Sequence, residues 1–169
     1  MFQITGDYDK DPITPDEVSL NGKFIKYGES VKPDAYRVVI RKRGYDPVDE
    51  RIVIDPKSVP YILQKLLNSS PRRVEHYIIA KFPANMRLFP DTCTLNNRDV
   101  VGEQSFKPGE YALDIKRSGY KPIQKPTKIP PDDGPFIIKE IMDPTLRQVS
   151  LSIAQDIPHD DPNIQPNVR

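Results

Sequence analysis

The second half of the chain repeats the first. The segment that begins DEVSLNGKF at Asp16 returns 75 residues later as DTCTLNNRD at Asp91, and the two stay in step without a gap to Pro56 and Pro131. Solenoid repeats are usually about 20–50 residues long, so this longer period predicts small domains. We divide the chain of 169 residues into a first module, 1–72, a second module, 73–147, and a segment, 148–169, that starts a third copy or forms a tail.

Alternating apolar residues predict half-buried antiparallel strands in both copies. The expected inner positions are Tyr36, Val38 and Ile40 in the first copy and Tyr111, Leu113 and Ile115 in the second. The two tyrosines share this face with aliphatic residues, so we assign them to the core.

Turn residues bound these strands. Asn21-Gly22 is typical of a two-residue type I′ turn, and the second copy has Asn96-Asn97, since Asn also tolerates the left-handed region. Gly44 and Gly119, which follow the central strands, are expected to take positive φ. A further strand ends at Ile54. We expect it to be weaker in the second copy, which keeps only Ile129 before two prolines.

Two short segments, 61–67 and 136–142, fit either a helix or a strand. We favour strands, because the second segment is rich in β-branched residues and prolines lie on both sides. Beyond the best-matched block, Phe2 and Ile4 align with Tyr77 and Ile79 at the same spacing. We expect the modules to dock end to end through strands near 61–82 and 136–153.

The frame KPGEYALDIKRSGYKP, from Lys107 to Pro122, and its counterpart KPDAYRVVIRKRGYDP, from Lys32 to Pro47, resemble the PEGA domain family. The preceding Leu-Asn-Gly matches that family's strand ending in a turn glycine. The family's namesake Pro-Glu-Gly-Ala is replaced by Pro-Asp-Glu-Val and Pro-Asp-Thr-Cys, which end at Val18 and Cys93. The resemblance implies a small prealbumin-like β-sandwich and structural or binding work, often in prokaryotic surface layers and envelopes, without catalytic residues.

These observations predict an all-β fold of tandem small antiparallel β-sandwich modules, prealbumin-like or immunoglobulin-like, that form a rod. The expected function is structural: an interaction protein of a cell-surface or envelope assembly, whose partners are proteins, including further copies of itself. The alternative is a ligand-binding adhesive module for a cell-wall glycan or protein. The extracytoplasmic location comes from the resemblance alone, and the N-terminal residues lack the basic start and apolar core of a signal peptide.

Composition argues against several other classes. The chain carries 25 basic and 24 acidic residues, a net charge of +1, which provides no field to attract nucleic acid. No run approaches the roughly 20 apolar residues of a membrane span. The single cysteine, Cys93, aligns with Val18 and is expected to be a buried strand thiol that packs as a small hydrophobe.

The sequence contains no catalytic constellation and no cofactor motif, so we expect neither enzymatic activity nor a cofactor. The alternating Asp7, Asp9 and Asp11 are interpreted as solvated loop residues, because they lack the spacing of a calcium loop. His159-Asp160-Asp161 lies in the Pro-rich tail, and the corresponding Ala84-Asn85 lacks ligands. We therefore predict no metal site. The expected contact surface consists of exposed aromatic residues: Tyr8, Phe24, Tyr27, Tyr45 and Tyr120. Tyr8, Phe24 and Tyr27 have no aromatic partner at the repeat spacing and would mark a ligand site on the first module.

Overall fold

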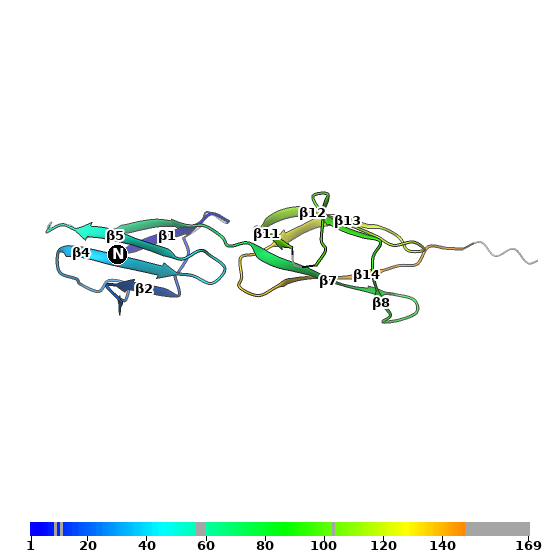
Figure 1. Ribbon diagram of the computed structural model, residues 1–169, viewed down its shortest axis with the longest axis horizontal. Helices are drawn as coiled ribbons and strands as arrows, with labels where there is room; N and C mark the ends of the chain where they lie inside the picture. Colours follow the sequence, from blue (N-terminus) through cyan, green and yellow to red (C-terminus); the bar gives the residue numbers. More distant parts are fainter. Residues whose placement is uncertain (9, 11, 57–59, 103, 148–169) are drawn as a thin grey trace, which may run out of the picture.

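The computed structural model consists of two β-sandwiches joined end to end (Figure 1). It describes residues 1–8, 10, 12–56, 60–102 and 104–147. These residues form strands, turns and loops, and none of them is helical. Within the same ranges, no helix is long and apolar enough to cross a membrane. The predicted all-β sandwich fold is confirmed.

The first module packs a four-stranded sheet on a two-stranded one. The larger sheet is antiparallel throughout and has the order β3-β2-β4-β5. Its strands are β2 (Glu17–Leu20), β3 (Lys23–Phe24), β4 (Asp34–Arg41) and β5 (Val48–Ile54). The smaller sheet pairs β1 (Phe2–Gly6) with β6 (Leu63–Leu67) in parallel.

The second module has the same plan. Its first sheet is antiparallel with the order β10-β9-β12-β13, and its second sheet has the order β11-β7-β14, with β8 also paired to β7. The first sheet contains β9 (Thr92–Leu95), β10 (Arg98–Asp99), β12 (Gly109–Lys116) and β13 (Ile123–Ile129). The second contains β7 (Arg72–Ala80), β8 (Arg87–Leu88), β11 (Ser105–Phe106) and β14 (Phe136–Met142).

Each module buries its own core between its two sheets. In the central strands, Val38 and Ile40 of the first module and Ile115 of the second have no exposed surface. Tyr36 and Tyr111 pack against the core from its edge, and each hydroxyl donates to the carbonyl of the lysine four residues earlier. The alternation in the sequence therefore identified the inner faces of both central strands.

The two ambiguous segments are strands. Leu63 and Leu67 in β6, and Ile138 and Met142 in β14, point into the cores. Both strands pair in parallel with the first strand of their module, whereas the sequence led us to expect antiparallel pairing alone. The chain crosses from one sheet to the other and back between the paired strands, which is the kind of long connection that parallel pairing requires.

The predicted hairpin turns are also confirmed. Asn21 and Gly22 have φ angles of 50° and 79°, and Asn96 and Asn97 have angles of 49° and 62°. Each hairpin closes with the two-residue loop expected of a type I′ turn.

Two sequence-based expectations were wrong in detail. Strand β13 covers the seven positions that are equivalent to β5, so it is not shortened. Its Pro126 is tolerated because β13 is an edge strand, where a missing amide costs no ladder bond. The spacing of 75 also fails in the first strands. Phe2 pairs with Leu63 and His76 pairs with Ile138, so Phe2 corresponds to His76 rather than to Tyr77.

An aspartate directly before β2 in the first module, and before β9 in the second, ties two segments together. Asp16 accepts hydrogen bonds from the Lys42 ammonium at 2.8 Å and the Arg43 amide at 2.7 Å. Asp91 does the same with the Ser118 amide at 2.7 Å and the Arg117 guanidinium at 2.8 Å. These bonds lower the pKa of both carboxyl groups, chiefly through Lys42 for Asp16 and through the Ser118 amide for Asp91.

We expect Asp91→Ala to lower the melting temperature of the second module at neutral pH. Because the folded pKa of Asp91 lies below its ordinary value of 3.8, the stabilisation is present above that pH and disappears as the pH falls through the folded value. The difference between variant and wild type should therefore shrink in acid, as measured by thermal melts across pH. Glu110→Ala, at an exposed position of β12, is the control, and a difference that does not change with pH would contradict this account.

Cys93 is the buried strand thiol that the sequence predicted. It lies in β9 with 6% of its surface exposed, and burial, followed by the charges of Asp114 and Asp99, raises its pKa to about 11. We expect a thiol reagent at pH 8 to modify Cys93 only after denaturation, because only the thiolate reacts. Rapid labelling of the native protein would contradict this expectation.

Candidate functional site: the module junction and the open end of the first module

The five aromatic residues expected to form a contact surface do not lie together. Tyr45 and Tyr120 pack against the cores of their own modules. Tyr8 lies at the junction, where the Lys128 ammonium is 4.9 Å from its ring centroid. Phe24 and Tyr27 keep 68% and 67% of their surface exposed, and Tyr27 meets the ring of Phe2 edge to face at 6.3 Å. Phe24 and Tyr27 alone among the five project mainly into solvent.

The junction between the modules is short and braced. Residues 68–71 connect β6 to β7. Ser69 forms a bridge with Tyr45, and the Ser70 amide donates to the Gly44 carbonyl at 3.0 Å. The Asp46 amide in turn donates to the carbonyl of Asn68 at 2.8 Å. The linker is therefore attached to the end of the first module along its length.

The turn at residues 42–44 makes the direct contact with the second module. The Gly44 amide donates to Asp133 Oδ1 at 2.7 Å, and Arg43 Nε lies 2.6 Å from Asp132 Oδ1. The backbone approach is so close that a Cβ on Gly44 would lie 2.4 Å from the Asp132 nitrogen. Gly44 is thus required twice, for its φ of 78° and for the space that it leaves.

Arg72, the first residue of β7, has its guanidinium buried in the facing end of the second module. It donates to the carbonyls of Gly134, Pro130 and Pro135 at 2.6, 3.0 and 3.2 Å and stacks over the Phe136 ring at 5.6 Å. Its Nη2 also lies 3.4 Å from Asp132 Oδ2. A buried cation is tolerated only when its donors are paired in this way.

Asp132 connects the two sets of contacts, because it faces both Arg43 and Arg72. The Asp133 amide is the main cause of its lowered pKa, and the two arginine charges lower it further. An ionised Asp132 thus joins a residue of the first module to the buried arginine of the second.

The expectation that strands 61–82 and 136–153 dock the modules is wrong for the described residues. Strands β6, β7 and β14 lie within the sheets of their own modules, whereas the contacts across the junction include those of Arg43 and Gly44 with the 132–133 turn and of Tyr8 with Lys128 of β13. The physical reason is that strands β6 and β14 use their hydrogen-bonding groups to pair with β1 and β7. The part of the prediction that concerns residues 148–169 lies outside the described residues.

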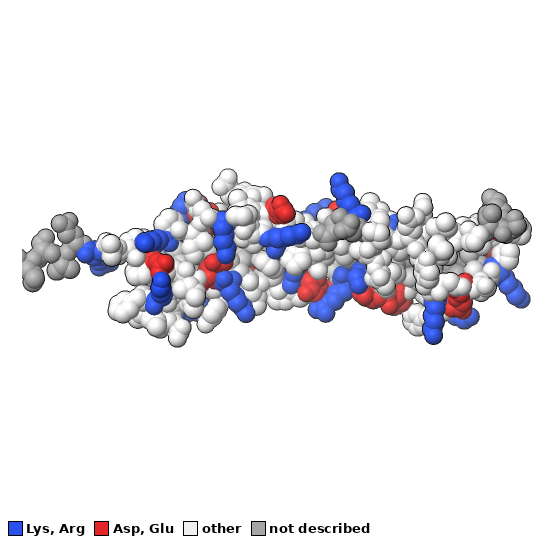
Figure 2. All heavy atoms as spheres, turned by 180° about the vertical axis from the view of Figure 1, so that it is seen from behind, with Lys and Arg blue, Asp and Glu red and all other residues white. Residues whose placement is uncertain are grey.

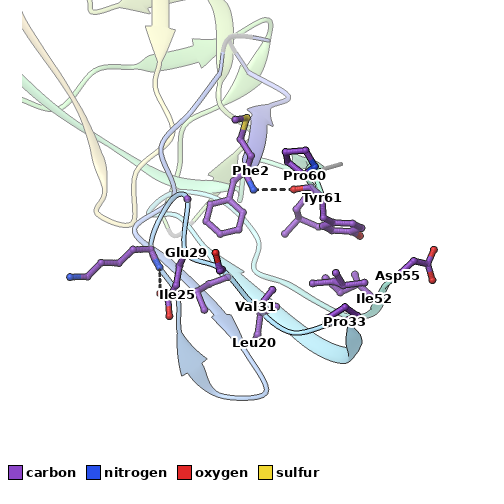
Figure 3. Close-up of a pocket in the computed structure, with 16 residues that line it drawn as sticks. Phe2, Leu20, Ile25, Glu29, Val31, Pro33, Ile52, Asp55, Pro60 and Tyr61 are labelled. Atoms are coloured by element: carbon purple, nitrogen blue, oxygen red, sulfur yellow. Dashed lines mark hydrogen bonds between the residues drawn. The ribbon is translucent and has the colours of Figure 1, made fainter. Parts of the chain in front are cut away.

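The opposite end of the first module is open. A pocket of about 500 Å³ lies there, between the starts of β1 and β6 and the end of β5. Figure 3 shows Phe2, Val31, Pro33 and Tyr61 around it, with the Met1 ammonium bound to the Tyr61 carbonyl. Glu29, Asp55 and Lys26 also line it, so its walls are largely apolar and its rim carries charges of both signs. A second pocket of about 360 Å³ is bordered by Tyr27.

Surface charge is mixed on both modules. Figure 2 shows basic and acidic side chains interspersed along the visible face, without a continuous patch of one sign. In the described ranges, no group of three or more His, Cys, Asp or Glu side chains is arranged to hold a metal ion. Neither His159 nor the Asp7–Asp9–Asp11 set is described in full.

Comparison with protein-family models and with curated proteins gives no match. Among solved structures, the chain is similar to the Bacillus anthracis TIE protein, with 17% sequence identity and a TM-score of 0.39. The similarity covers 85% of this chain and 33% of that protein. Similarity at this level leaves the function to be argued from the chain itself.

Sequence reasoning missed the residues that build the junction. No role was assigned from the sequence to Arg72 or to the Asp132-Asp133 pair. One signal was available: Arg147 lies one repeat after Arg72, and the two positions before Gly134 are acidic, whereas their counterparts 57 and 58 are Lys and Ser. A difference between repeats at one turn marks a site that only one copy needs.

We expect Gly44→Ala to separate the modules, whereas Gly119→Ala should not. Both residues have positive φ, 78° and 83°, so each substitution carries the same backbone strain of about 1 kcal/mol. A Cβ on Gly119 would have Arg147 Nη2 as its nearest neighbour, at 3.9 Å, whereas one on Gly44 would strike the second module's backbone. Protease cleavage at residues 68–71 should rise in the first variant only. Equal cleavage of the two variants would contradict this assignment.

Proposed function

We propose that the chain is a structural and interaction protein: a stiff rod of tandem PEGA-like β-sandwich repeats within a cell-surface or envelope assembly. Its partners are proteins, including further copies of itself. The observation that carries the proposal is the junction, where Arg43, Gly44 and Asp133 join two modules that have separate cores. Catalysis at a cleft within one module does not require the two modules to be fixed to each other. A spacer does require it, because it must transmit force or keep its partners at a fixed distance.

The surface supports the same proposal. Mixed charge along the rod keeps a protein soluble without attracting nucleic acid or anionic lipid. The extracytoplasmic location rests on the resemblance to the PEGA family, with which the sandwich fold agrees.

The alternative function is ligand binding by the first module, for a cell-wall glycan or protein. Phe24 and Tyr27 favour it, because they are exposed and the second module has Asp99 and Gly102 at the corresponding positions. Exposed aromatic side chains are the usual platforms for such contacts. A Phe24→Ala/Tyr27→Ala double variant that binds immobilised cell-wall glycan as well as the wild type does would exclude this alternative.

The rod is tested by small-angle scattering at low concentration. We expect the wild-type chain to show one narrow distribution of lengths, matching two modules end to end. Arg43→Ala/Asp133→Ala should broaden it, since the variant loses the polar contacts between the modules and keeps the linker and the Tyr8–Lys128 contact. Arg37→Ala, which breaks the exposed Arg37–Asp49 pair within the first module, is the control. A broad distribution for the wild type would refute the stiff rod.

A further inference from the structure

The open pocket of the first module is a strand position that the second module fills. Strand β7 has nine residues, whereas β1 has five. The first three residues of β7, Arg72 to Val74, run between β11 and the start of β14. In the first module, the segments that correspond to these neighbours are 30–31 and 61–62. Within the described ranges, no strand lies between them, and the pocket of about 500 Å³ occupies the place.

The register shows that the match is close. Phe2 corresponds to His76, so Met1 corresponds to Glu75. The described residues of the first module include no counterparts of Arg72, Arg73 and Val74. In the second module these positions are well buried at their inner residues, with Arg72 at 9% and Val74 at 1% exposure.

The walls of the pocket repeat the surroundings of Arg72. Asp55 and Pro60 stand where Pro130 and Pro135 present their carbonyls to Arg72, and Tyr61 stands where Phe136 lies beneath the guanidinium. Asp55, Pro60 and Tyr61 all line the pocket (Figure 3). Glu29 and Asp55 line its rim together with Lys26 and the Met1 ammonium, so the match to the surroundings of Arg72 rests on Asp55, Pro60 and Tyr61. The pocket is thus built for a short strand that begins with an arginine.

The far end of the second module leads into a segment that begins with an arginine. Tyr120 bridges to Pro144, and the Thr145 amide donates to the Gly119 carbonyl at 2.9 Å. These bonds repeat, at a spacing of 75 residues, the ones that Tyr45 and Gly44 make with the linker ahead of β7. Two residues later comes Arg147, exposed in this structure and next to Leu146, which is 98% exposed.

The sequence continues the correspondence. Residues 147–149 read Arg-Gln-Val, and residues 72–74 read Arg-Arg-Val. The arginine and valine correspond to the two buried residues among the first three of β7, so the segment carries the side chains that the pocket lacks.

The Tyr8–Lys128 contact across the junction also has a counterpart, made up of one residue at each outer end of the molecule. Asp7 and Lys81 make equivalent amide bonds to Leu67 and Met142, so Phe82 occupies the position of Tyr8. Val53 occupies the position of Lys128, which lies over the Tyr8 ring. Phe82 is 73% exposed and Val53 is 64% exposed. End-to-end docking would replace a cation–π contact with burial of two apolar side chains.

We propose that residues 147–149 of one copy add as a short strand to the open pocket of the first module of a second copy, so that chains join head to tail in the geometry of the internal junction. This inference rests on the proposed function, because it names the partner of the rod and the surface that binds it. The two surfaces differ, so the contact is heterologous and leaves both outer ends free for growth. Strand addition of this kind is a general mode of recognition.

Sedimentation velocity on the whole chain, from about 1 µM to about 1 mM, provides the test. We expect the mean size to grow with concentration in the wild type. Arg147→Ala should weaken association at least roughly tenfold, because it removes a buried, charged donor. Lys139→Ala, at an exposed position of β14, removes one positive charge elsewhere and should change nothing. Wild-type chains that stay monomeric throughout, or an Arg147→Ala variant that associates normally, would overturn the proposal.

A mixing experiment separates head-to-tail docking from any symmetric contact. Arg147→Ala leaves the pocket intact, and Tyr61→Ala removes the ring beneath the arginine but leaves residues 147–149 intact. Each variant alone should stay small, whereas an equal mixture should form one dimer and stop, because only one pair of ends is competent. Growth beyond the dimer, or no dimer at all, would refute the geometry. Circular dichroism melts verify that both variants are folded.

The outcome is distinguishable from failure of the proposed function. The rod is measured at low concentration, where copies do not meet, and assembly is measured at high concentration. A stiff monomer that never associates would retain the rod and reject the docking. A flexible chain that still associates through Arg147 would do the reverse.

Discussion

The structure depends on a buried cation. Arg72 follows the linker directly, and its guanidinium lies in the end of the second sandwich, where an apolar residue would be expected. Removing a charge from water is costly unless every donor finds an acceptor, so the chain from Pro130 to Pro135 must turn its carbonyls inward. That turn carries Asp132 and Asp133 at its tip, and these are the residues that meet Arg43 and Gly44 of the first module. The internal chemistry of one sandwich thus creates the surface on which the other docks.

The two modules share the hydrogen bonds that stabilise each sandwich and differ in the residues at their outer ends and edges. The asparagine at each hairpin accepts a bond from the central strand, at 2.8 Å from the Arg37 amide and 2.7 Å from the Ala112 amide. Asp16 and Asp91 also each accept one hydrogen bond from a backbone amide and one from a basic side chain. The acidic turn exists in the second module, and the exposed aromatic pair exists in the first. Repetition therefore preserves the fold, and the differences between copies lie at ends and edges, where contacts with partners form.

Much of the fold could be predicted from the sequence, because strands reveal themselves through alternation and turns through residues that tolerate positive φ. The parallel pairing could not be predicted, since nothing in the short segments 61–67 and 136–142 specifies the direction of a partner. The register of the first strands was missed by one residue, because the extra residue of the second module lies in the loop between β7 and β8, where no pattern marks it. Arg72 was missed for a deeper reason. Its acceptors are backbone carbonyls about sixty residues away, and carbonyls are present in every sequence.

The same contact has different consequences within a chain and between chains. At the internal junction, residues 68–71 hold the two surfaces together at an effective concentration on the order of millimolar or higher. Docking there is continuous even though the contact is small, and small interfaces bind weakly when their partners are free. Between copies, the equivalent surfaces lack this tether and also lack the ion pair, because Ser118 replaces Arg43. On our proposal, a rod built in this way keeps its shape at any concentration and joins its neighbours only where copies are crowded.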